Sequence, residues 1–265
     1  YGSSAASDVY KRQFEINSAS DACFDLAEDS VVTLRDGEMT DCNSNGNSWG
    51  GAVINYPGST AGSLIMENID IEDSLVNLID VDFANVWISN VTATSASANS
   101  GNALAAEGDG TGSSIYVYNM DAPDYSSVTI YSLDSISLED VDLGSASVSI
   151  SPGGTSSTAA GPSGSSAMID TLTSGSVTMT RTAPTLDNLD IGALTIMGNS
   201  PGSDPIMGEN WDTDGISVSG CGYKVHGTTV TTDYVAGSCS NSASPNMITL
   251  GAVSYTHLTL PTIRM

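Results

Sequence analysis

The chain has 265 residues and a formal net charge of −25, with 31 Asp and Glu against 6 Lys and Arg. This length fits one large all-β unit or two small domains. The acidic excess argues against nucleic acid and anionic membranes as partners, because phosphate binding needs a basic surface. No apolar run approaches the roughly 18 residues of a membrane span, so we expect none in this chain.

Both ends of the chain resemble translated sequencing-adapter sequence, over Ser3–Gln13 and Val253–Met265. We therefore expect residues 1–13 and 253–265 to be artefactual or disordered and exclude them from the fold. Residues 14–252 are expected to form a single domain, a fragment of a larger secreted or surface protein.

One short pattern recurs along the chain: apolar-x-apolar, a small polar corner, then apolar-x-apolar. In its clearest copy, Asn85–Ala93, Val86 and Ile88 should point inward before the corner, and Val91 and Ala93 after it. Repeats of roughly 20 to 30 residues, each too small to bury its own apolar face, indicate a solenoid. Other copies begin at Val32, Ile69, Ile115, Ile136, Leu189 and Ile216.

These copies resemble the right-handed parallel β-helix, or pectin-lyase-like, superfamily. The resemblance implies an all-β β-solenoid of roughly eight coils, in which a left-handed residue at a two-residue corner stacks from coil to coil. It places Asn90, Asn119, Asp140 and Gly220 at that corner. The alternative is a pair of tandem immunoglobulin-like β-sandwiches, which need similar short strands but do not predict the recurring corner.

The four cysteines fall into two similarly spaced pairs, Cys23 with Cys42 and Cys221 with Cys239. Neither pair has the short spacing of a zinc knuckle. We predict two disulfides and an extracellular or cell-surface location, with four buried thiols as the alternative.

Several acidic residues alternate along predicted strands, which would place two carboxylates on one outward face. Such oxygen ligands suit Ca²⁺, although no motif requires a cofactor and none has the spacing of a calcium loop. The alternative is a solvated acidic face. The metal candidates are Asp70, Glu72, Asp80, Asp82, Asp140 and Asp142.

The segment Asn210–Ile216 looks like the Asn-Thr-Asp-Gly motif of polygalacturonase-type glycoside hydrolases, with Asp212 in place of the Asn and Asp214 as candidate acid. An inverting hydrolase needs a second carboxylate to activate water. The family's downstream Asp pair, Gly-His-Gly and Arg-x-Lys are incomplete here, since only His226-Gly227 and a lone Asp233 follow. We therefore interpret the Asp-Gly pair as a plain turn.

A polysaccharide lyase would need a basic residue beside the uronate, but the three cations between the excluded ends are far apart in sequence: Arg35, Arg181 and Lys224. Three tryptophans could stack on sugars, with Trp87 outward on a strand and Trp49 and Trp211 in loops, but because they form no cluster we favour packing at the solvent edge. Ice binding would need Thr at one outward place in successive coils, and the repeat steps do not place Thr92, Thr129 and Thr178 so.

The sequence thus predicts a non-catalytic extracellular or cell-surface scaffold or adhesin, with divalent cations as candidate stabilisers and polysaccharide or other cell-surface components as candidate partners. The alternative is a carbohydrate-active enzyme on the same fold, a glycoside hydrolase or polysaccharide lyase. Any chemistry is expected in three predicted loop regions, Ala96–Thr111, Pro152–Ser166 and Asn199–Asp214.

Overall fold

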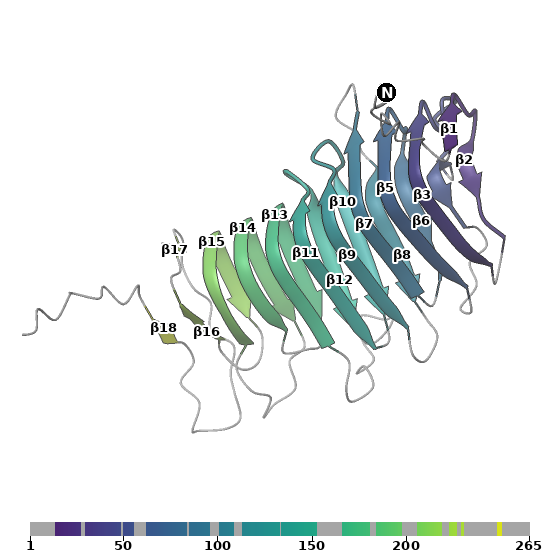
Figure 1. Ribbon diagram of the computed structural model, residues 1–265. Coiled ribbons are helices and arrows are strands. Elements are labelled where there is room, and N and C mark those ends of the chain that lie inside the picture. Colours follow the sequence, from purple (N-terminus) through teal and green to yellow (C-terminus); the bar gives the residue numbers. More distant parts are fainter. Residues whose placement is uncertain are drawn as a thin grey trace, which may run out of the picture.

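The structure of the chain, a computed structural model, describes residues 14–27, 30–48, 50–55, 62–83, 85–95, 101–108, 113–132, 134–152, 166–180, 184–197, 206–218, 223–226, 229–230 and 248–250. Every regular element within these ranges is a β-strand (Figure 1). Both predicted artefactual ends lie outside them.

The strands follow one another in chain order. They are β1 (Phe14–Asn17), β2 (Ala22–Asp25), β3 (Val31–Thr40), β4 (Gly51–Ile54), β5 (Ser63–Glu72), β6 (Asn77–Val81), β7 (Asn85–Thr94), β8 (Asn102–Gly108), β9 (Ser114–Asp121), β10 (Ser127–Ser132), β11 (Ser135–Asp142), β12 (Ser147–Pro152), β13 (Ser166–Thr180), β14 (Thr185–Met197), β15 (Ile206–Val218), β16 (Tyr223–His226), β17 (Thr229–Val230) and β18 (Ile248–Leu250).

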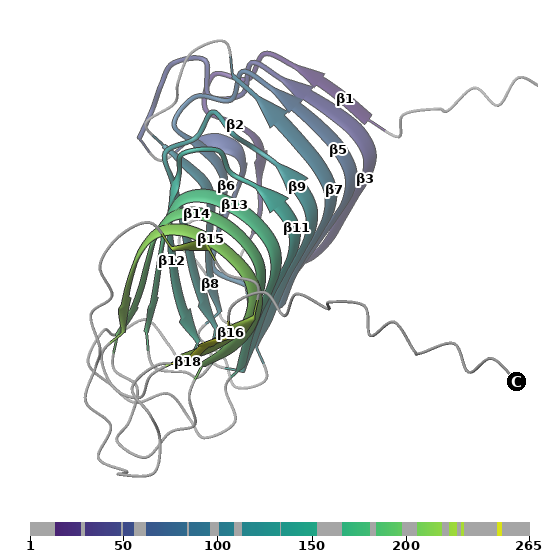
Figure 2. The same cartoon turned by 90° about the vertical axis from the view of Figure 1, so that its left-hand side faces the viewer.

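All strand pairs in the described ranges are parallel and belong to one sheet. Odd-numbered strands pair in succession from β1 to β11, and even-numbered strands from β2 to β12. The chain thus passes from one ladder to the other and back, and we call one such pass a circuit. Thirteen strands curve through 321° round an axis. Figure 2 shows how the sheet wraps round on itself. The parallel pairing rules out antiparallel immunoglobulin-like sandwiches.

Three later strands belong to both ladders at once. The first part of β13 pairs with β11 and its last part with β12, and β14 and β15 continue both pairings. In these circuits the chain passes from the first ladder into the second within one long strand.

Eight strands, β3, β5, β7, β9, β11, β13, β14 and β15, each contain one non-glycine residue with a φ between 51° and 60°. These corner residues are skipped in the pairing register, so each strand has a half before the corner and a half after it. They are Asp36, Asn68, Asn90, Asn119, Asp140, Thr171, Asn188 and Asn210.

The core lies inside the curved sheet and is built from columns that take one apolar residue from each circuit. The predicted inward residues Val86, Ile88, Val91 and Ala93 are at most 2% exposed, which confirms the pattern in that copy. Each buried Val or Ile side chain contributes about 1.5–3 kcal/mol. A typical column comprises Leu34, Met66, Ile88, Val117, Leu138, Ile169 and Leu186.

Three predicted copies of the pattern were placed in the wrong register. Ile69 and Leu189 follow their corners rather than precede them, and Ile216 lies in the part of β15 that continues the second ladder. Alternation with a period of two marks a strand but does not say on which side of a corner the strand lies. The circuit boundaries that follow from the spacing of these residues are therefore displaced from those in the structure.

Two of the three predicted loop regions contain strands. β8 lies inside Ala96–Thr111, and β15 begins inside Asn199–Asp214. The small side chains of Ala103 and Ala106, both fully buried, fill the core beside Leu104 without the bulky apolar signal of a typical strand. Residues 153–165, most of the third region, lie outside the described residues.

Candidate functional site

Most corner residues are joined by a ladder of side-chain hydrogen bonds. The amide Nδ2 of Asn68 donates to Asp36 Oδ1 at 2.8 Å, and Asn90 and Asn119 each donate to the preceding Asn at 2.9 Å. Asn tolerates the left-handed conformation better than other non-glycine residues, which explains the residue type. The polar side chains of these corners are therefore used in stacking the circuits.

The ladder has two runs. Asp140 carries a carboxylate, which has no hydrogen to donate to the Asn119 oxygen, and a β-branched Thr171 follows it at a φ of 60°. A second run begins when Asn188 donates to Asp170 Oδ1 at 2.7 Å, and Asn210 donates to Asn188 at 2.8 Å. The predicted corner Gly220 lies outside the described residues, and the corner of β15 is Asn210.

The predicted catalytic segment is a continuous part of β15. Asp212 and Asp214 are exposed on its outward side, while Trp211 and Thr213, which alternate with them, are buried at 1% and 2% exposure. The pairing register skips Asp214, at the point where β15 passes from the first ladder to the second, so the Asp-Gly pair lies at an irregularity within one strand and not in a turn between strands. The closest carboxylate by register is Asp190, which faces Asp212 across the β14–β15 pair.

Trp211 cannot stack on a sugar. Its indole lies in a core column next to Leu189, and its Nε1 donates to the backbone oxygen of Leu186 at 2.7 Å. A buried indole N–H needs a partner of this kind. The prediction that Trp211 lies in a loop is therefore wrong, and Trp49 lies outside the described residues.

The six metal candidates do not meet in one place. No group of three or more His, Cys, Asp or Glu residues in the described ranges could hold a metal ion. Asp70 and Glu72 are exposed on β5, whereas Asp140 and Asp142 are exposed on β11, three circuits away. Asp142 accepts a hydrogen bond from the backbone of Gly144 at 2.9 Å. Asp80 is partly buried on β6, where Asn77 donates to it at 3.0 Å and burial raises its pKa.

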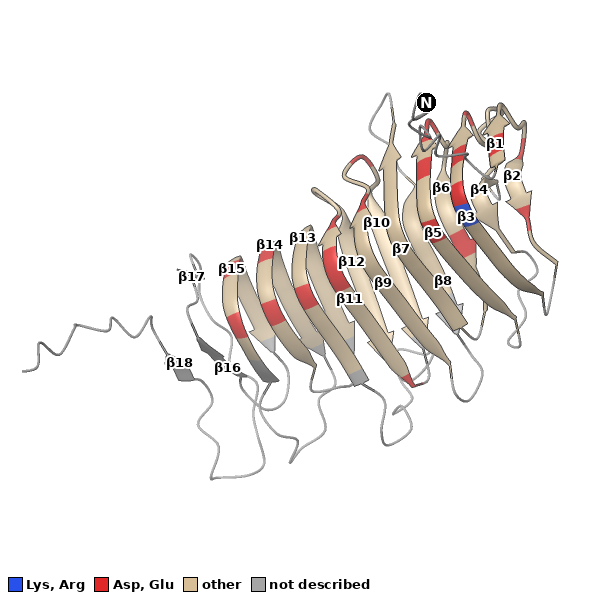
Figure 3. Cartoon of the chain, viewed as in Figure 1, with Lys and Arg blue, Asp and Glu red and all other residues tan. Residues whose placement is uncertain are grey.

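The acidic residues instead form columns that run across the circuits, visible as rows on the strands in Figure 3. One column lies two residues after each corner, and we call it the outer acidic column. It comprises Glu15, Glu38, Asp70, Thr92, Asp121, Asp142, Thr173, Asp190 and Asp212. Burial, and then the charges of Asp142 and Asp124, raise the pKa of Asp121.

A row of hydroxyl residues follows the outer side of the second ladder. Thr129, Ser149, Thr178, Thr195 and Ser217 share one register position from β10 to β15. Thr129 and Thr178 therefore do recur at one outward place, contrary to the sequence prediction, whereas Thr92 belongs to the outer acidic column. The number of residues between successive copies of the pattern does not reveal this shared register position, because β13 contributes residues to both ladders.

Cys23 and Cys42 form the predicted disulfide, with their Cα atoms 5.4 Å apart. It joins β2 to Cys42, two residues after the end of β3, and so ties together the first circuit. Cys221 and Cys239 lie outside the described residues, as do Arg181 and the side chains of Lys224 and His226. Arg35 pairs with Glu67 at 2.7 Å.

Three aromatic side chains gather on the outward side of β7 and β9, before the corner. The ring centroids of Trp87 and Tyr116 are 4.1 Å apart with a 33° tilt, and Tyr118 lies two residues further along β9. Trp87 is 46% and Tyr118 38% exposed. The outward position of Trp87 is predictable from the sequence, whereas the proximity of Tyr116 and Tyr118 is not, because only the strand register brings them beside it.

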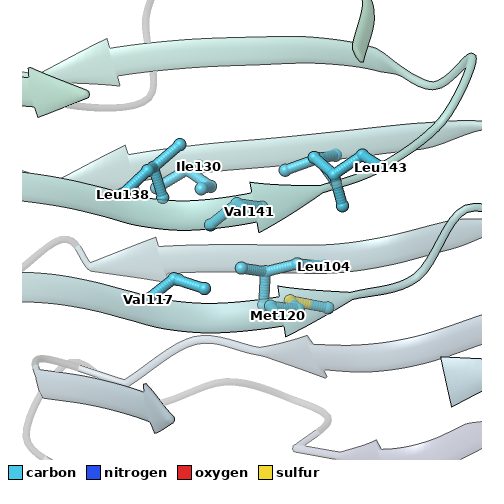
Figure 4. Close-up of a pocket in the computed structure, with 8 residues that line it drawn as sticks. Leu104, Val117, Met120, Ile130, Leu138, Val141 and Leu143 are labelled. Atoms are coloured by element: carbon cyan, nitrogen blue, oxygen red, sulfur yellow. The ribbon is translucent and has the colours of Figure 1, made fainter. Parts of the chain in front are cut away.

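A small apolar cavity lies inside the core near β9 and β11 (Figure 4). Its volume is about 10 Å³, and its lining side chains are aliphatic or Met. Such a space offers a water molecule no polar partner, so we regard it as a packing defect rather than a ligand site. It is lined by Leu104, Val117, Met120, Val128, Ile130, Leu138, Val141 and Leu143.

Comparisons of the chain with protein-family models, with curated proteins and with solved structures gave no match. No helix that could span a membrane occurs in the part of the chain that the structure describes. The columns of side chains described above are therefore the features from which a function can be inferred.

Proposed function

We propose that this chain is a right-handed parallel β-helix of the pectin-lyase-like kind that serves as a non-catalytic extracellular or cell-surface scaffold or adhesin. The observation that carries the proposal is the succession of left-handed corners in eight stacked strands, most of them linked by side-chain hydrogen bonds. Parallel strands joined by crossovers are almost always right-handed, which supports the handedness.

A stack of this kind suits a spacer. Each circuit adds about 4.8 Å along the axis and uses the previous circuit as its interface. The disulfide between Cys23 and Cys42 supports an oxidising location, since such bonds persist mainly outside the cytosol. Divalent cations would reduce repulsion along the outer acidic column and so stabilise the stack.

A carbohydrate-active enzyme is the second candidate. It is favoured by one observation, the exposure of Asp212 and Asp214 on β15 with Asp190 facing Asp212 on the next strand. Two carboxylates are the minimum that glycoside hydrolysis needs.

Turnover of uronate and neutral polysaccharides, with and without Ca²⁺, separates the two candidates. The scaffold proposal expects no release of reducing ends or unsaturated products by the full chain. The matched variants are Asp214→Asn and Asp70→Asn, the second in the outer acidic column but far from β15. Cleavage that Asp214→Asn abolishes and Asp70→Asn preserves would contradict the scaffold proposal and support the hydrolase.

A further inference from the structure

The exposed large apolar side chains in the described ranges all lie on one wall of the molecule. Val31, Trp87, Tyr118 and Met168 belong to the halves of β3, β7, β9 and β13 that precede the corner, and all point outward. Contiguous groups of such side chains mark interaction sites, whereas single ones are normal. Val31 and Met168 lie apart from the others on β3 and β13. The contiguous group is that of Trp87, Tyr116 and Tyr118, which we call the aromatic platform.

A row of carboxylates continues from the platform in the same register. Tyr118 faces Glu139 on β11, and the position then passes to Asp170, Asp187 and Glu209 on β13, β14 and β15. Burial, followed by the Glu139 charge, raises the pKa of Tyr116, which places this carboxylate within electrostatic reach of the platform.

Two of these carboxylates are held in place by their own neighbours. Asp170 accepts from Asn188 at 2.7 Å, and Asp187 accepts from the backbone of Glu209 at 3.0 Å. A carboxylate has further lone pairs, so both still present acceptors outward. In contrast, β7, the strand of Trp87, carries no charged residue and is drawn without red or blue in Figure 3.

We propose that this wall binds a linear polysaccharide of amino sugars, lying parallel to the axis, with a sugar ring stacked on the aromatic platform and amines over Glu139, Asp170 and Asp187. The inference rests on the proposed adhesin-type role and names its ligand class. Sugar rings stack on aromatic faces through their C–H groups, and an ammonium group is attracted both to the rings and to carboxylates. The strand spacing of roughly 4.8 Å is close to one pyranose repeat, so successive sugars would meet successive circuits.

Other occupants fit less well. The charge of −25 disfavours a polyuronate or another anionic polymer. A second copy of the chain would bring carboxylates against carboxylates. A stable protein interface buries about 800 Å² on each side, far more than the few exposed side chains of the platform provide.

Calorimetric titration of the full chain with a hexamer of glucosamine tests the proposal. We expect binding that Trp87→Ala or Tyr118→Ala weakens about tenfold, whereas Glu139→Gln weakens the glucosamine hexamer more than its N-acetylated form. The matched control is Val31→Ala, since Val31 is 79% exposed on the same wall but two strands from Trp87. Unchanged circular dichroism of each variant would show that it folds.

Three further ligands define the outcomes. Oligogalacturonate should not bind, and hexalysine should bind more weakly than the glucosamine hexamer, because it cannot stack as a sugar ring does. Equal affinity for hexalysine or for the N-acetylated hexamer, an unaffected Trp87→Ala variant, or no binding of the glucosamine hexamer would each overturn the proposal. The scaffold proposal fails if the chain cleaves a polysaccharide, whereas the present proposal fails through the binding results above. The two failures are therefore distinguishable.

Discussion

At the scale of single residues, the stack depends on side chains that accept an unusual backbone conformation and also hydrogen-bond along the axis. Asn90 does both, since it donates to Asn68 and accepts from Asn119. Asp140 and Thr171 adopt the conformation but do not continue the row. A left-handed β-branched residue such as Thr171 costs about 1–2 kcal/mol relative to the right-handed region.

Replacement of Asp140 by Asn should stabilise the protein. The new amide would donate to Asn119 Oδ1 and extend the first run by one circuit, which contributes about 0.5–1.5 kcal/mol. Thermal and urea unfolding would measure the gain. Asp140→Gly is the control, since it removes the same charge and tolerates the same φ of 53° but has no donor. If Asp140→Gly stabilised as much as Asp140→Asn, the hydrogen bond would not be the cause.

At the scale of the strands, the sequence was sufficient for the all-β class, the parallel wrapping sheet and the inward residues of β7. It was insufficient to place the strands and corners of circuits that depart from the repeated apolar-x-apolar pattern. Leu189 and Ile216 lie in stretches where apolar and polar residues alternate as regularly as they do around Val86. However, β13, β14 and β15 each run through both ladders in one strand, so the spacing between corners shortens. Thr171 gives no left-handed signal in sequence, and Trp211 gave no sign that it fills a core position occupied by Leu189 one circuit earlier.

Residues of the candidate site were likewise predictable only where they are neighbours in the sequence. Asp212 and Asp214 were found because they are adjacent in a motif, whereas the aromatic platform joins Trp87 to residues about 30 positions later. No local pattern in a single sequence reports such a register. A side chain's outward direction was predictable, but its neighbour on the next circuit was not, because the connections between strands differ in length.

The disulfide should stabilise the first circuits more than the rest. In a molecule built by stacking, each circuit contacts mainly its neighbours, so a tether between β2 and the end of β3 acts locally. The double variant Cys23→Ser, Cys42→Ser should lose about 3 kcal/mol in that region. Hydrogen exchange should rise in β1 to β4 and stay unchanged in β11 to β14. Uniform acceleration through all circuits would contradict this local role.

At the scale of the whole molecule, the dominant electrostatic feature is repulsion between like charges stacked one strand apart. Glu38 with Asp70, Asp121 with Asp142, and Asp190 with Asp212 are three such pairs in the outer acidic column. Opposed like charges destabilise a strand pair. Salt should therefore stabilise the protein, and Ca²⁺ should exceed NaCl at equal ionic strength if divalent cations bind the column.

Asp121→Asn should raise the melting temperature at pH 7 by roughly 1–3 °C, corresponding to less than 1 kcal/mol after solvent screening. The folded-state pKa of Asp121 is raised above 3.8, so the native state binds its proton more tightly than the unfolded state. The free energy of unfolding therefore falls as the pH rises through this window, and the penalty is complete at neutral pH.

Calorimetry of Asp121→Asn at pH 7 and below pH 4, in low and high salt, checks this. The benefit should disappear at the lower pH and shrink in high salt. Asp25→Asn serves as control, because the register neighbour of Asp25 is the uncharged Ile54. An equal gain from Asp25→Asn would show that net charge alone is responsible.

The hydrogen bonds of the corner ladder all point the same way, from each circuit to the one before it, and each run begins on a carboxylate that only accepts. Every Asn corner therefore presents a donor to its predecessor and an acceptor to its successor, whatever their sequences. Unequal recombination could duplicate or remove a circuit that has an Asn corner. The corners on either side would still pair donor with acceptor after such a change. The length of such a molecule is thus free to evolve in whole steps, while each circuit's outward residues diverge independently.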